Sequence, residues 1–244
     1  MQLSENTILI TGATSGIGNA FALEFLKNNN TVIICGRRED RLNAIKNEYQ
    51  GIITKVCDIA DAKQREDLCV WAIENYPNLN ILINNAGVQY AADLHKPIDL
   101  EKLNNEVTTN FVAPVHLASL FTAHLKDKKN GAIINISSGL AFVPIAFMPV
   151  YCATKAAIHS FTLSLRFQLK NTDIKVFEIA PPAVDTELGH DRREDKSQSH
   201  GGLPINEFIA EAMQAINDDL LEAPIANAKG LRAKGEEMFP VLNH

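Results

Sequence analysis

The chain has 244 residues, of which 46% are hydrophobic and 21% charged, and its formal net charge at pH 7 is −6. This balance is that of an ordinary globular protein, and α/β chains of this length often form a single domain. The net negative charge gives no electrostatic reason to expect nucleic acid or an anionic membrane surface as the main partner.

Four cysteines are spaced without a CxxC pair, and no histidine cluster accompanies them: Cys35, Cys57, Cys69 and Cys152. We therefore predict free thiols that pack as small hydrophobes in a reducing compartment, and no metal site. The N-terminal stretch leads directly into a strand-like run, without the basic and apolar regions of a signal peptide. No apolar run approaches the ~18 residues that suggest a membrane span. These features predict a cytoplasmic protein.

Short apolar runs alternate with longer segments of helical period. The predicted strands cover residues 7–11, 31–35, 52–56, 80–84, 132–137 and 174–180. The predicted helices lie near residues 17–28, 38–48, 62–75, 100–126 and 151–170. Because strands and helices alternate, we expect an α/β fold in which helical crossovers join parallel strands. Nearly continuous apolar strands are typical of a sheet that is covered on both faces.

The alternation breaks after residue 186. Residues 187–202 are charged, polar and glycine-containing, and residues 204–221 have the pattern of another amphipathic helix. A long loop inside a compact domain is usually either functional or disordered, so this one is either a lid over a site or a merely mobile loop. We favour the lid and treat residues 187–220 as a substrate-specificity segment within a single domain, 1–244.

A glycine-rich turn joins the first predicted strand to the first predicted helix. It contains Gly12, Gly16 and Gly18 within ILITGATSGIGNAFALEFL, residues 8–26. Such a turn lets the backbone approach a phosphate closely and presents the N–H groups of a helix N-terminus, where the helix dipole favours an anion. Glycines also simply make tight turns, but the position between strand and helix predicts a dinucleotide site. The spacing is TGxxxGIG, not GxGxxG.

The second predicted strand ends in CGRRED, residues 35–40. In dinucleotide folds an acidic residue at this strand end commonly binds the adenosine ribose, but here Gly36 stands in that place, followed by Arg37 and Arg38. A carboxylate would repel a 2′-phosphate, whereas a guanidinium binds one well. We therefore favour NADP over NAD, with Arg37 the better candidate. The alternative is that both arginines are solvent-exposed charges at the start of a helix.

Further motifs follow in a fixed order. They are TGATSGIG at 11–18, Asp58 in VCDIAD, NNAG at 84–87, Asn110 in TTNFVAP, Ser138 in NISSG, YCATK at 151–155 and PPAVDT at 181–186. With them the chain resembles the short-chain dehydrogenase/reductase family over roughly residues 7–186. The resemblance implies a Rossmann-type, doubly wound parallel sheet and hydride transfer between a nicotinamide cofactor and an alcohol or carbonyl group. PPAVDTEL and the closing EEMFPVLNH are also similar to a bacterial branch named after the D-alanyl-lipoteichoic acid operon, which supplies no substrate.

The resemblance also implies roles for individual positions. The cofactor would be bound by Gly12, Ser15, Gly16, Ile17, Gly18, Arg37, Arg38, Asp58, Ile59, Asn85, Ala86, Gly87, Tyr151, Lys155, Pro181, Val184 and Thr186. Catalysis would be carried by Ser138, Tyr151 and Lys155, with Asn110 holding a water near the lysine. The family's Pro-Gly turn is Pro181-Pro182 here, which removes a flexible residue beside the nicotinamide.

Elementary chemistry supports the catalytic assignment. A free phenol has a pKa of ~10, so only about one in a thousand is ionised at pH 7. Lys155 follows Tyr151 by four residues, which makes the two side chains neighbours on a helix. A nearby cation lowers the pKa of a phenol, and we predict a decrease of a few pH units for Tyr151. The tyrosine would donate the proton in reduction and accept it in oxidation, while Ser138 would stabilise charge on the substrate oxygen.

Each of these residues also has an ordinary structural explanation. Ser138 could be a turn serine, Tyr151 an aromatic at a helix start, Lys155 a solvated charge, and Asn110 a backbone cap in a long helix that we expect to bend there. The joint spacing, in which twelve residues separate the serine from YxxxK, argues against four independent coincidences.

Two other functions fit parts of the pattern. A dinucleotide-binding sensor or scaffold would keep the glycine turn but often lack the tyrosine or the lysine, and both are present here. A sugar-nucleotide epimerase or dehydratase on the same architecture resembles longer chains with TGxxGxxG spacing. We therefore predict an NADP-dependent oxidoreductase that acts on a small or medium alcohol or carbonyl compound.

The resemblance also implies an oligomeric state, and the sequence suggests which residues contact the substrate. The long helices at 100–126 and 151–170 form a four-helix interface in the family, so we expect a homodimer or homotetramer. Substrate contacts are expected at positions that are mostly apolar and uncharged: Gln89, Leu140, Met148, Pro182 and His190. This composition disfavours a highly charged substrate.

Overall fold

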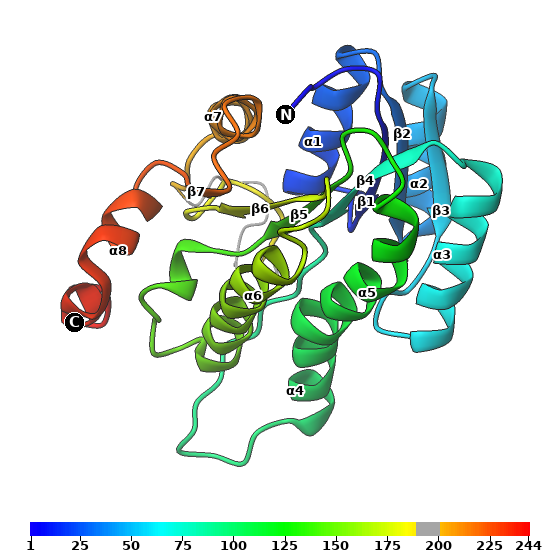
Figure 1. The fold of residues 1–244 in the computed structure, drawn as a ribbon. Helices are drawn as coiled ribbons and strands as arrows, with labels where there is room; N and C mark the ends of the chain where they lie inside the picture. The colour runs from blue at the N-terminus through cyan, green and yellow to red at the C-terminus, as the bar shows by residue number, and fades with distance from the viewer. Residues whose placement is uncertain (189–200) are drawn as a thin grey trace.

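A seven-stranded parallel sheet forms the centre of the computed structural model, which describes residues 1–188 and 201–244 (Figure 1). The strand order is β3-β2-β1-β4-β5-β6-β7. The strands are β1 (Thr7–Thr11), β2 (Thr31–Gly36), β3 (Ile52–Val56), β4 (Leu79–Asn84), β5 (Ala132–Ile136), β6 (Lys175–Ala180) and β7 (Glu222–Pro224). The six predicted strands and the doubly wound parallel sheet are confirmed. The sequence pattern missed β7, because this edge strand has only three residues.

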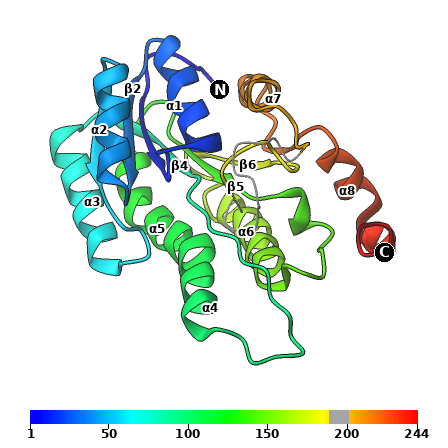
Figure 2. The same ribbon diagram turned by 180° about the vertical axis from the view of Figure 1, so that it is seen from behind.

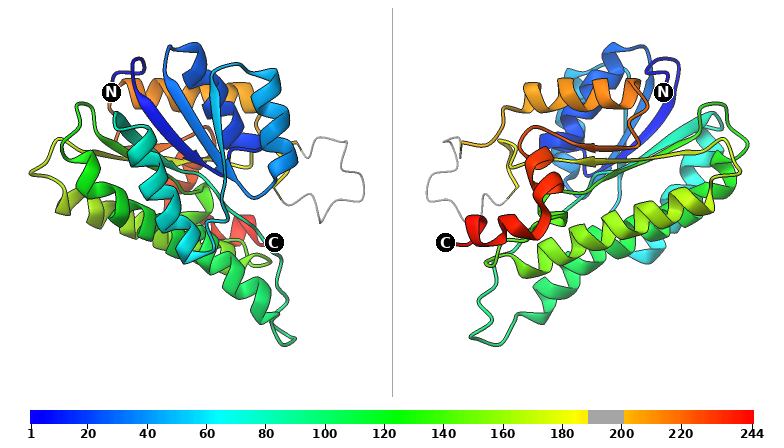
Figure 3. Two further views of the ribbon diagram at one scale, coloured as in Figure 1. Left: turned by 90° about the vertical axis from the view of Figure 1, so that its right-hand side faces the viewer. Right: turned by 60° about the vertical axis from the view of Figure 1, so that its left-hand side comes forward.

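Helices cover both faces of the sheet. They are α1 (Gly16–Lys27), α2 (Glu39–Glu48), α3 (Ala62–Asn75), α4 (Leu100–Val107), α5 (Ala113–Leu125), α6 (Pro149–Gln168), α7 (Ile205–Asn217), α8 (Ala228–Lys234) and α9 (Phe239–Leu242). Seen from behind, the N-terminus lies near α1 and α7, while the C-terminal end lies beyond α8, away from α3 (Figure 2). Figure 3 shows α1 and α7 on one side of the sheet and α4, α5 and α6 on the other.

Alternating side chains of each strand enter two separate cores, as the period of two in a strand requires. On β1, Ile8 and Ile10 pack on the α1 and α7 side with Phe21 and Phe208. Leu9, between them, packs on the α3, α5 and α6 side. Because both faces of the strands are buried, their sequences are continuously apolar, which explains why the strand predictions succeed.

Local signals set several helix boundaries. Asp61 accepts a hydrogen bond from the backbone N–H of Gln64 at 3.0 Å and caps α3. Asp99 caps α4 in the same way. Pro149 stands at the start of α6, where a proline costs no hydrogen bond. The long helix predicted over 100–126 is interrupted by a π-helical turn at Thr108–Val112, which includes Asn110; the bend expected there stays a prediction.

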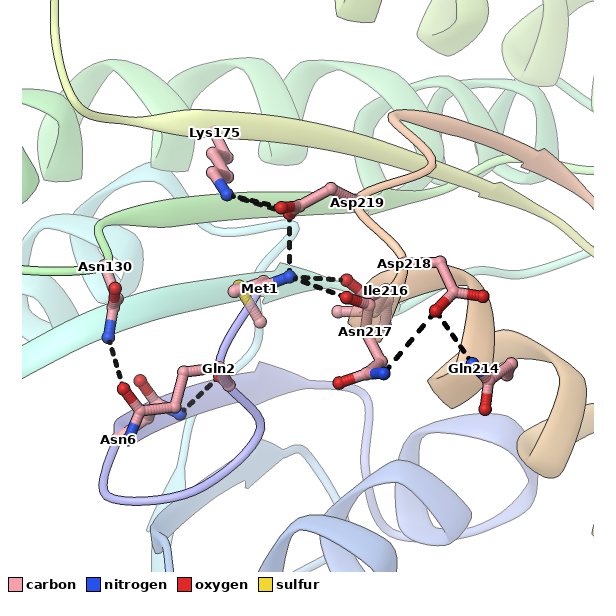
Figure 4. A network of polar contacts seen from close by, with 10 residues as sticks. All are labelled: Met1, Gln2, Asn6, Asn130, Lys175, Gln214, Ile216, Asn217, Asp218 and Asp219. Atoms are coloured by element: carbon pink, nitrogen blue, oxygen red, sulfur yellow. Dashed lines mark hydrogen bonds and ion pairs between the residues drawn. The ribbon is translucent and has the colours of Figure 1, made fainter.

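The N-terminus, the end of α7 and the start of β6 are joined by polar contacts (Figure 4). The Met1 ammonium donates to the carbonyl oxygens of Ile216 and Asn217, at 2.9 and 3.2 Å, where the dipole of α7 favours a cation. It also contacts Asp219 Oδ1 at 2.7 Å, and Lys175 Nζ lies 2.8 Å from both oxygens of that carboxylate. These contacts tie the C-terminal end of α7 to the N-terminus and to the start of β6.

The structure also bears on the remaining predictions about organisation. Helix α7 confirms the amphipathic helix expected after the polar loop. Residues 189–200, and with them His190 and most of the predicted lid, lie outside the described residues. The four cysteines are free and buried, as predicted. Within 1–188 and 201–244, none of the helices is both long and apolar enough to cross a membrane.

Candidate active site

A cavity of about 900 Å³ opens at the carboxyl ends of the parallel strands. Strands β2 and β3 lie on one side of β1, and β4 and the strands after it lie on the other. Open α/β sheets bind their ligands at such a switch point in the strand order, here between β1 and β4. The cavity is lined by every described residue that the sequence assigned to cofactor, catalysis or substrate, except Asn110. Segments far apart in the sequence therefore meet at one site.

The turn after β1 forms the floor of one end of the cavity. Gly12 has φ = +65°, and a Cβ added to it would lie 2.5 Å from the Cα of Ala86. A Cβ at Gly18 would overlap the side-chain amide of Asn85. That amide donates to the carbonyl oxygens of Thr11 and Gly12, at 2.9 and 3.1 Å. The residue after β4 thus fixes the turn after β1, and only glycine fits at both contact points.

The two arginines after β2 differ in their surroundings. Arg38 donates to Thr14 Oγ1 at 2.6 and 3.1 Å and to Ser15 Oγ at 2.9 Å. The Arg37 side chain is 55% exposed, and its Nη1 lies 3.9 Å from Asp58 Oδ2, beyond hydrogen-bond distance. Arg37 is therefore the less constrained of the two guanidinium groups.

Glu187 also reaches this end of the cavity. Its carboxylate accepts from Arg38 at 3.1 Å and from Arg41 at 2.5 and 2.7 Å. Although partial burial opposes ionisation, the hydrogen bonds from Arg41 and Arg38 hold the pKa of Glu187 below its ordinary value. Nothing in the sequence pattern singles out Glu187 beyond its place directly after Thr186.

The other end of the cavity carries the serine, tyrosine and lysine. Tyr151 and Lys155 lie one turn apart on α6, with Lys155 Nζ 5.6 Å from the centre of the tyrosine ring. Lys155 Nζ donates to the carbonyl oxygen of Ile136 at 2.9 Å. Since Ile136 ends β5, this bond ties the lysine to the strand that leads to Ser138. The side chains of Ser138, Tyr151 and Lys155 are all buried.

Burial shapes the electrostatics of the lysine. Loss of hydration lowers the pKa of Lys155 to about 8, and the negative charge of Glu178 opposes part of this decrease. Glu178 is fully buried on β6, and one of its oxygens lies 2.8 Å from His159 Nδ1. A lysine with this pKa remains largely protonated at neutral pH, so it can stabilise a neighbouring phenolate.

The same carboxylate belongs to a small charged group at the sheet edge. Nitrogen and oxygen atoms of His159, Glu178 and Glu222 lie within 4.8 Å of one another, a spacing compatible with a metal ion. Arg232 Nε donates to Glu222 at 2.6 Å and already supplies a positive charge there. The absence of a metal site stays a prediction.

Ser138 is oriented by its own backbone neighbours. Its Oγ accepts a hydrogen bond from the Leu140 N–H at 3.1 Å, and the Gly139 N–H donates to the Pro181 carbonyl at 2.8 Å. A hydroxyl that accepts in this way still has its proton to donate. The serine can therefore offer an O–H donor to an oxygen in the cavity.

Asn110 lies beside this group, with 1% of its side chain exposed. Its Oδ1 accepts from the Val88 N–H and its Nδ2 donates to the Val88 carbonyl, both at 2.8 Å. Nδ2 also contacts Thr154 Oγ1 at 3.2 Å. The π-helical turn therefore places an amide that fixes the loop after β4 next to α6.

Comparison with known proteins assigns the family. A family model described as short chain dehydrogenase matches residues 6–197. The chain belongs to the short-chain dehydrogenase family. It is 46% identical to the uncharacterized oxidoreductase DltE of Bacillus subtilis, over 100% of this chain and 98% of that protein. The resemblance to the family and to its DltE-like branch is thereby confirmed.

Two further comparisons extend this assignment. The NADP-dependent 3-hydroxy acid dehydrogenase YdfG of Salmonella typhi is 30% identical over 84% of this chain and 86% of its own length. A short-chain dehydrogenase/reductase from Burkholderia phymatum in complex with NAD has a TM-score of 0.86 at 20% identity, covering 100% of this chain and 97% of that one. The second likeness concerns the fold alone.

The end of the cavity that carries Ser138 and Tyr151, where we predict the substrate, contains lining residues that the sequence pattern did not indicate. Of the predicted substrate positions, Gln89, Leu140, Met148 and Pro182 line the cavity. They are joined there by apolar side chains from the loop before α6, from the segment after Thr186 and from the C-terminal region: Ile145, Phe147, Leu188, Leu231 and Leu242. No spacing rule connects these segments, so only the folded chain brings them together.

Proposed function

We propose that this short-chain dehydrogenase uses NADP to transfer a hydride to or from a small or medium alcohol or carbonyl substrate, with Tyr151 as general acid and base. One observation carries the proposal: a glycine-rich turn and a Ser138–Tyr151–Lys155 group line the same cavity. The turn suits a dinucleotide, and the three side chains suit proton transfer at a substrate oxygen.

The residues around the turn fit a dinucleotide. With no room for a side chain at Gly12 or Gly18, backbone atoms face the cavity there. Ser15, at the start of α1, makes no capping hydrogen bond with its side chain. The first N–H groups of α1 therefore remain available to an anion, and they lie where the helix dipole favours one. Gly16 and Ile17 line the cavity beside them.

Three observations favour NADP over NAD. Gly36 stands where an acidic residue would bind ribose hydroxyls, and a Cβ added there would lie 2.8 Å from Thr14 Cγ2. Arg37 and Arg38 line the adjoining wall, where a guanidinium could bind a 2′-phosphate. The Salmonella relative is NADP-dependent by name. Arg37 is our preferred ligand for the 2′-phosphate because it is the less constrained guanidinium; NAD remains the alternative, as in the Burkholderia phymatum complex.

The chemistry can be derived from the chain's own side chains. A bound nicotinamide would supply or accept the hydride. Ser138 would donate a hydrogen bond to the substrate oxygen and stabilise its developing negative charge. Tyr151 would give that oxygen a proton during reduction and remove it during oxidation. Lys155, as a buried cation one turn away, would favour the phenolate form and bring the pKa of Tyr151 closer to neutral.

Asn110 and the remaining cofactor residues fit supporting roles. Asn110 would hold a relay water near Lys155, and its hydrogen bonds to Val88 keep the loop after β4 in place. Asp58 would contact the adenine, and Thr186 the nicotinamide amide; both line the cavity.

We also propose that the protein forms a homodimer or homotetramer in the cytoplasm. The outer surface of the helices predicted to associate exposes large apolar side chains, with Val112 42%, Leu163 43% and Phe167 67% exposed. Contact between copies would remove this apolar surface from water. Sedimentation equilibrium should show dimers or tetramers at micromolar concentration, and a monomer would contradict the proposal.

A cofactor titration followed by a substrate screen tests the function. Purified protein should quench or shift NADPH fluorescence on binding, and NADH should bind more weakly. Loss of NADPH absorbance should then reveal turnover with neutral aldehydes or ketones. A protein that binds neither cofactor is not the proposed enzyme, whereas one that binds NADPH but turns over nothing, with unchanged binding in Tyr151→Phe, would support the sensor alternative.

A further inference from the structure

A row of polar side chains crosses the sheet on the face that α6 covers. The strand register pairs Asn84 with Asn135, Asn135 with Glu178 and Glu178 with Glu222, so the row runs from β4 to β7. Asn84 Nδ2 donates to Asn135 Oδ1 at 2.9 Å, and Asn135 Nδ2 donates to Thr162 Oγ1 on α6 at 2.9 Å. The first three members of the row are at most 4% exposed. Because burying polar groups costs free energy unless they are hydrogen-bonded, the presence of a carboxylate in this row calls for an explanation.

The carboxylate of Glu178 lies close to the catalytic residues of α6. Tyr151, Lys155 and His159 follow one another at intervals of four residues, so they lie on one face of the helix. His159 Nδ1 is 2.8 Å from Glu178 Oε2. Lys155 Nζ donates to the carbonyl oxygen of Ile136 on β5, the strand next to β6. Glu178 is thus held near Lys155, on the side of the lysine away from Tyr151.

One oxygen of this carboxylate accepts no hydrogen bond. Glu178 is fully buried, and within residues 1–188 and 201–244 its Oε1 has no hydrogen-bond partner. An unsatisfied buried acceptor costs free energy, and more when the group is charged. An apolar side chain at this position would avoid that cost, which favours a role for the carboxylate other than packing.

The charges around Glu178 act on it from several elements. Within the described residues, the charged or titratable side chains near it come from α6, β7 and α8: Lys155, His159, Arg166, Glu222 and Arg232. Arg232 donates to Glu222 at 2.6 Å, and Arg166 donates to backbone carbonyl oxygens. Both arginines are partly exposed, whereas Lys155 is buried. Because water screens the charge of exposed groups more than that of buried ones, the charge of Glu178 acts most strongly on Lys155.

Loss of this charge would change which group of the active site loses its proton first. Burial lowers the pKa of Lys155 to about 8, and the charge of Glu178 opposes this decrease; Glu106, buried on α4, does not contribute. Without the carboxylate, the pKa of Lys155 would fall below 8. The first proton lost from the Tyr151–Lys155 pair would then come mainly from the lysine, and a neutral lysine no longer stabilises a phenolate.

We propose that Glu178 is a positioning residue of the active site, whose buried carboxylate, oriented by His159, keeps Lys155 protonated and so allows Tyr151 to ionise first. The residue acts through Lys155 and lies on β6, outside the Ser138–Tyr151–Lys155 group. This inference rests on the proposed function and adds to it the group that sets the pH range of the proton transfer.

The ultraviolet absorbance of tyrosinate tests the role without substrate or cofactor. The difference between each protein and its Tyr151→Phe counterpart isolates Tyr151 from the other tyrosines. Between about pH 8 and pH 9, the ionised fraction of Tyr151 should fall about threefold in Glu178→Gln, because the lysine is then largely neutral. Glu178→Met, a second neutral variant, should show the same fall. Glu178→Asp, which keeps the charge, should retain most of the wild-type fraction.

Glu222→Gln is the matched control. Glu222 belongs to the same row and loses the same charge, but it lies one strand farther from Lys155 and is paired with Arg232. It should leave the ionised fraction of Tyr151 nearly unchanged, and thermal melting shows which variants are folded. The proposal would be overturned by wild-type fractions in both neutral variants, by equal losses in Glu178→Gln and Glu222→Gln, or by a Glu178→Asp that behaves like Glu178→Gln.

The role of Glu178 and the proposed function can fail separately. A wild type that binds no NADPH refutes the function, and the absorbance titration of the cofactor-free protein still decides the role of Glu178. With an alcohol that the wild type oxidises, kcat/KM of Glu178→Gln should fall most near pH 8 and recover toward the wild-type value as the pH rises and Tyr151 ionises unaided. An equal loss at every pH would indicate a merely structural role and overturn the proposal.

Discussion

The two ends of the cavity are built in different ways. The cofactor end is formed largely by backbone, in turns whose contacts exclude any side chain at Gly12 and Gly18. The substrate end is formed by side chains from separate segments, and some of these, such as Phe147, are half exposed. The first arrangement tolerates few residue types, whereas the second tolerates many apolar ones. Chemistry that a family shares can therefore stay fixed at one end while specificity varies at the other.

The largest expected effect is the loss of kcat in Tyr151→Phe, at the residue where the two ends of the cavity meet. Tyr151→Phe removes the only group that we assign to proton transfer and keeps the aromatic ring. Since general acid–base catalysis contributes 10²–10⁴-fold, kcat should fall by about 10³. The dissociation constant of NADPH should change little, because the turn and the arginines are untouched. Steady-state kinetics and fluorescence titration check both; a kcat within tenfold of the wild type would remove Tyr151 from the role of proton carrier.

The cofactor end should respond sharply to one added methyl group. Gly12→Ala places a Cβ 2.5 Å from the Cα of Ala86 at a residue with φ = +65°, so the turn must shift. We expect the dissociation constant of NADPH to rise about 100-fold, or about 2.7 kcal/mol. Gly230→Ala is the control, because nothing lies within 4 Å of a Cβ at that helical position. That variant should bind NADPH normally and unfold at slightly higher temperature.

These differences explain what the sequence could predict. Continuous apolar strands and the glycine turn follow from local rules, so the sheet, the turn and the YxxxK pair were recognisable before folding. The apolar cavity lining at Leu231 and Leu242 was not, because an apolar residue in a short helix has the same pattern whether it faces a core or a cavity. Glu187 was missed for a related reason: its pairing with Arg38 and Arg41 joins residues nearly 150 positions apart.

A stability measurement can show how much the active site opposes folding. The pKa of Lys155 is held at about 8 instead of 10.5 by burial, which corresponds to about 3 kcal/mol. The unfolded chain binds the proton more tightly, so wild-type stability should rise as pH increases from 8 to 10.5. Lys155→Met should lose activity yet gain about 2 kcal/mol at pH 7, after allowance for the lost bond to Ile136.

Urea denaturation of both proteins at pH 7 and pH 10 tests this expectation. The advantage of Lys155→Met should shrink toward zero at pH 10, because the wild-type lysine is then largely neutral in the folded state and only the last half pH unit below the unfolded pKa of 10.5 still separates the two states. A variant that is less stable than the wild type at pH 7 would show that contacts of the ammonium outweigh its burial. The active site would then stabilise the fold rather than oppose it.

The smallest expected effect concerns Glu187, which contacts Arg38 and Arg41 from a distant part of the chain. Glu187 accepts hydrogen bonds from Arg38 and Arg41, so a 2′-phosphate that approached Arg38 would compete with it. Glu187→Gln should therefore tighten NADPH binding about threefold to fivefold at low salt, in keeping with the modest strength of partly exposed ion pairs. NADH, without the phosphate, should bind as before, and added salt should reduce the difference.

Glu39→Gln provides the matched control for this comparison. Glu39 is exposed one residue after Arg38, and within the described residues it forms no ion pair with either arginine, so its loss changes the local charge equally. If both variants tighten NADPH binding alike, the affinity depends on the total charge near the arginines and not on the hydrogen bonds of Glu187. If Glu187→Gln weakens it instead, the carboxylate orders Arg38 for the phosphate. In that case the cofactor end depends on a side chain from beyond Thr186, and the contrast between its backbone-built turn and the side-chain-built substrate end no longer holds at the arginines.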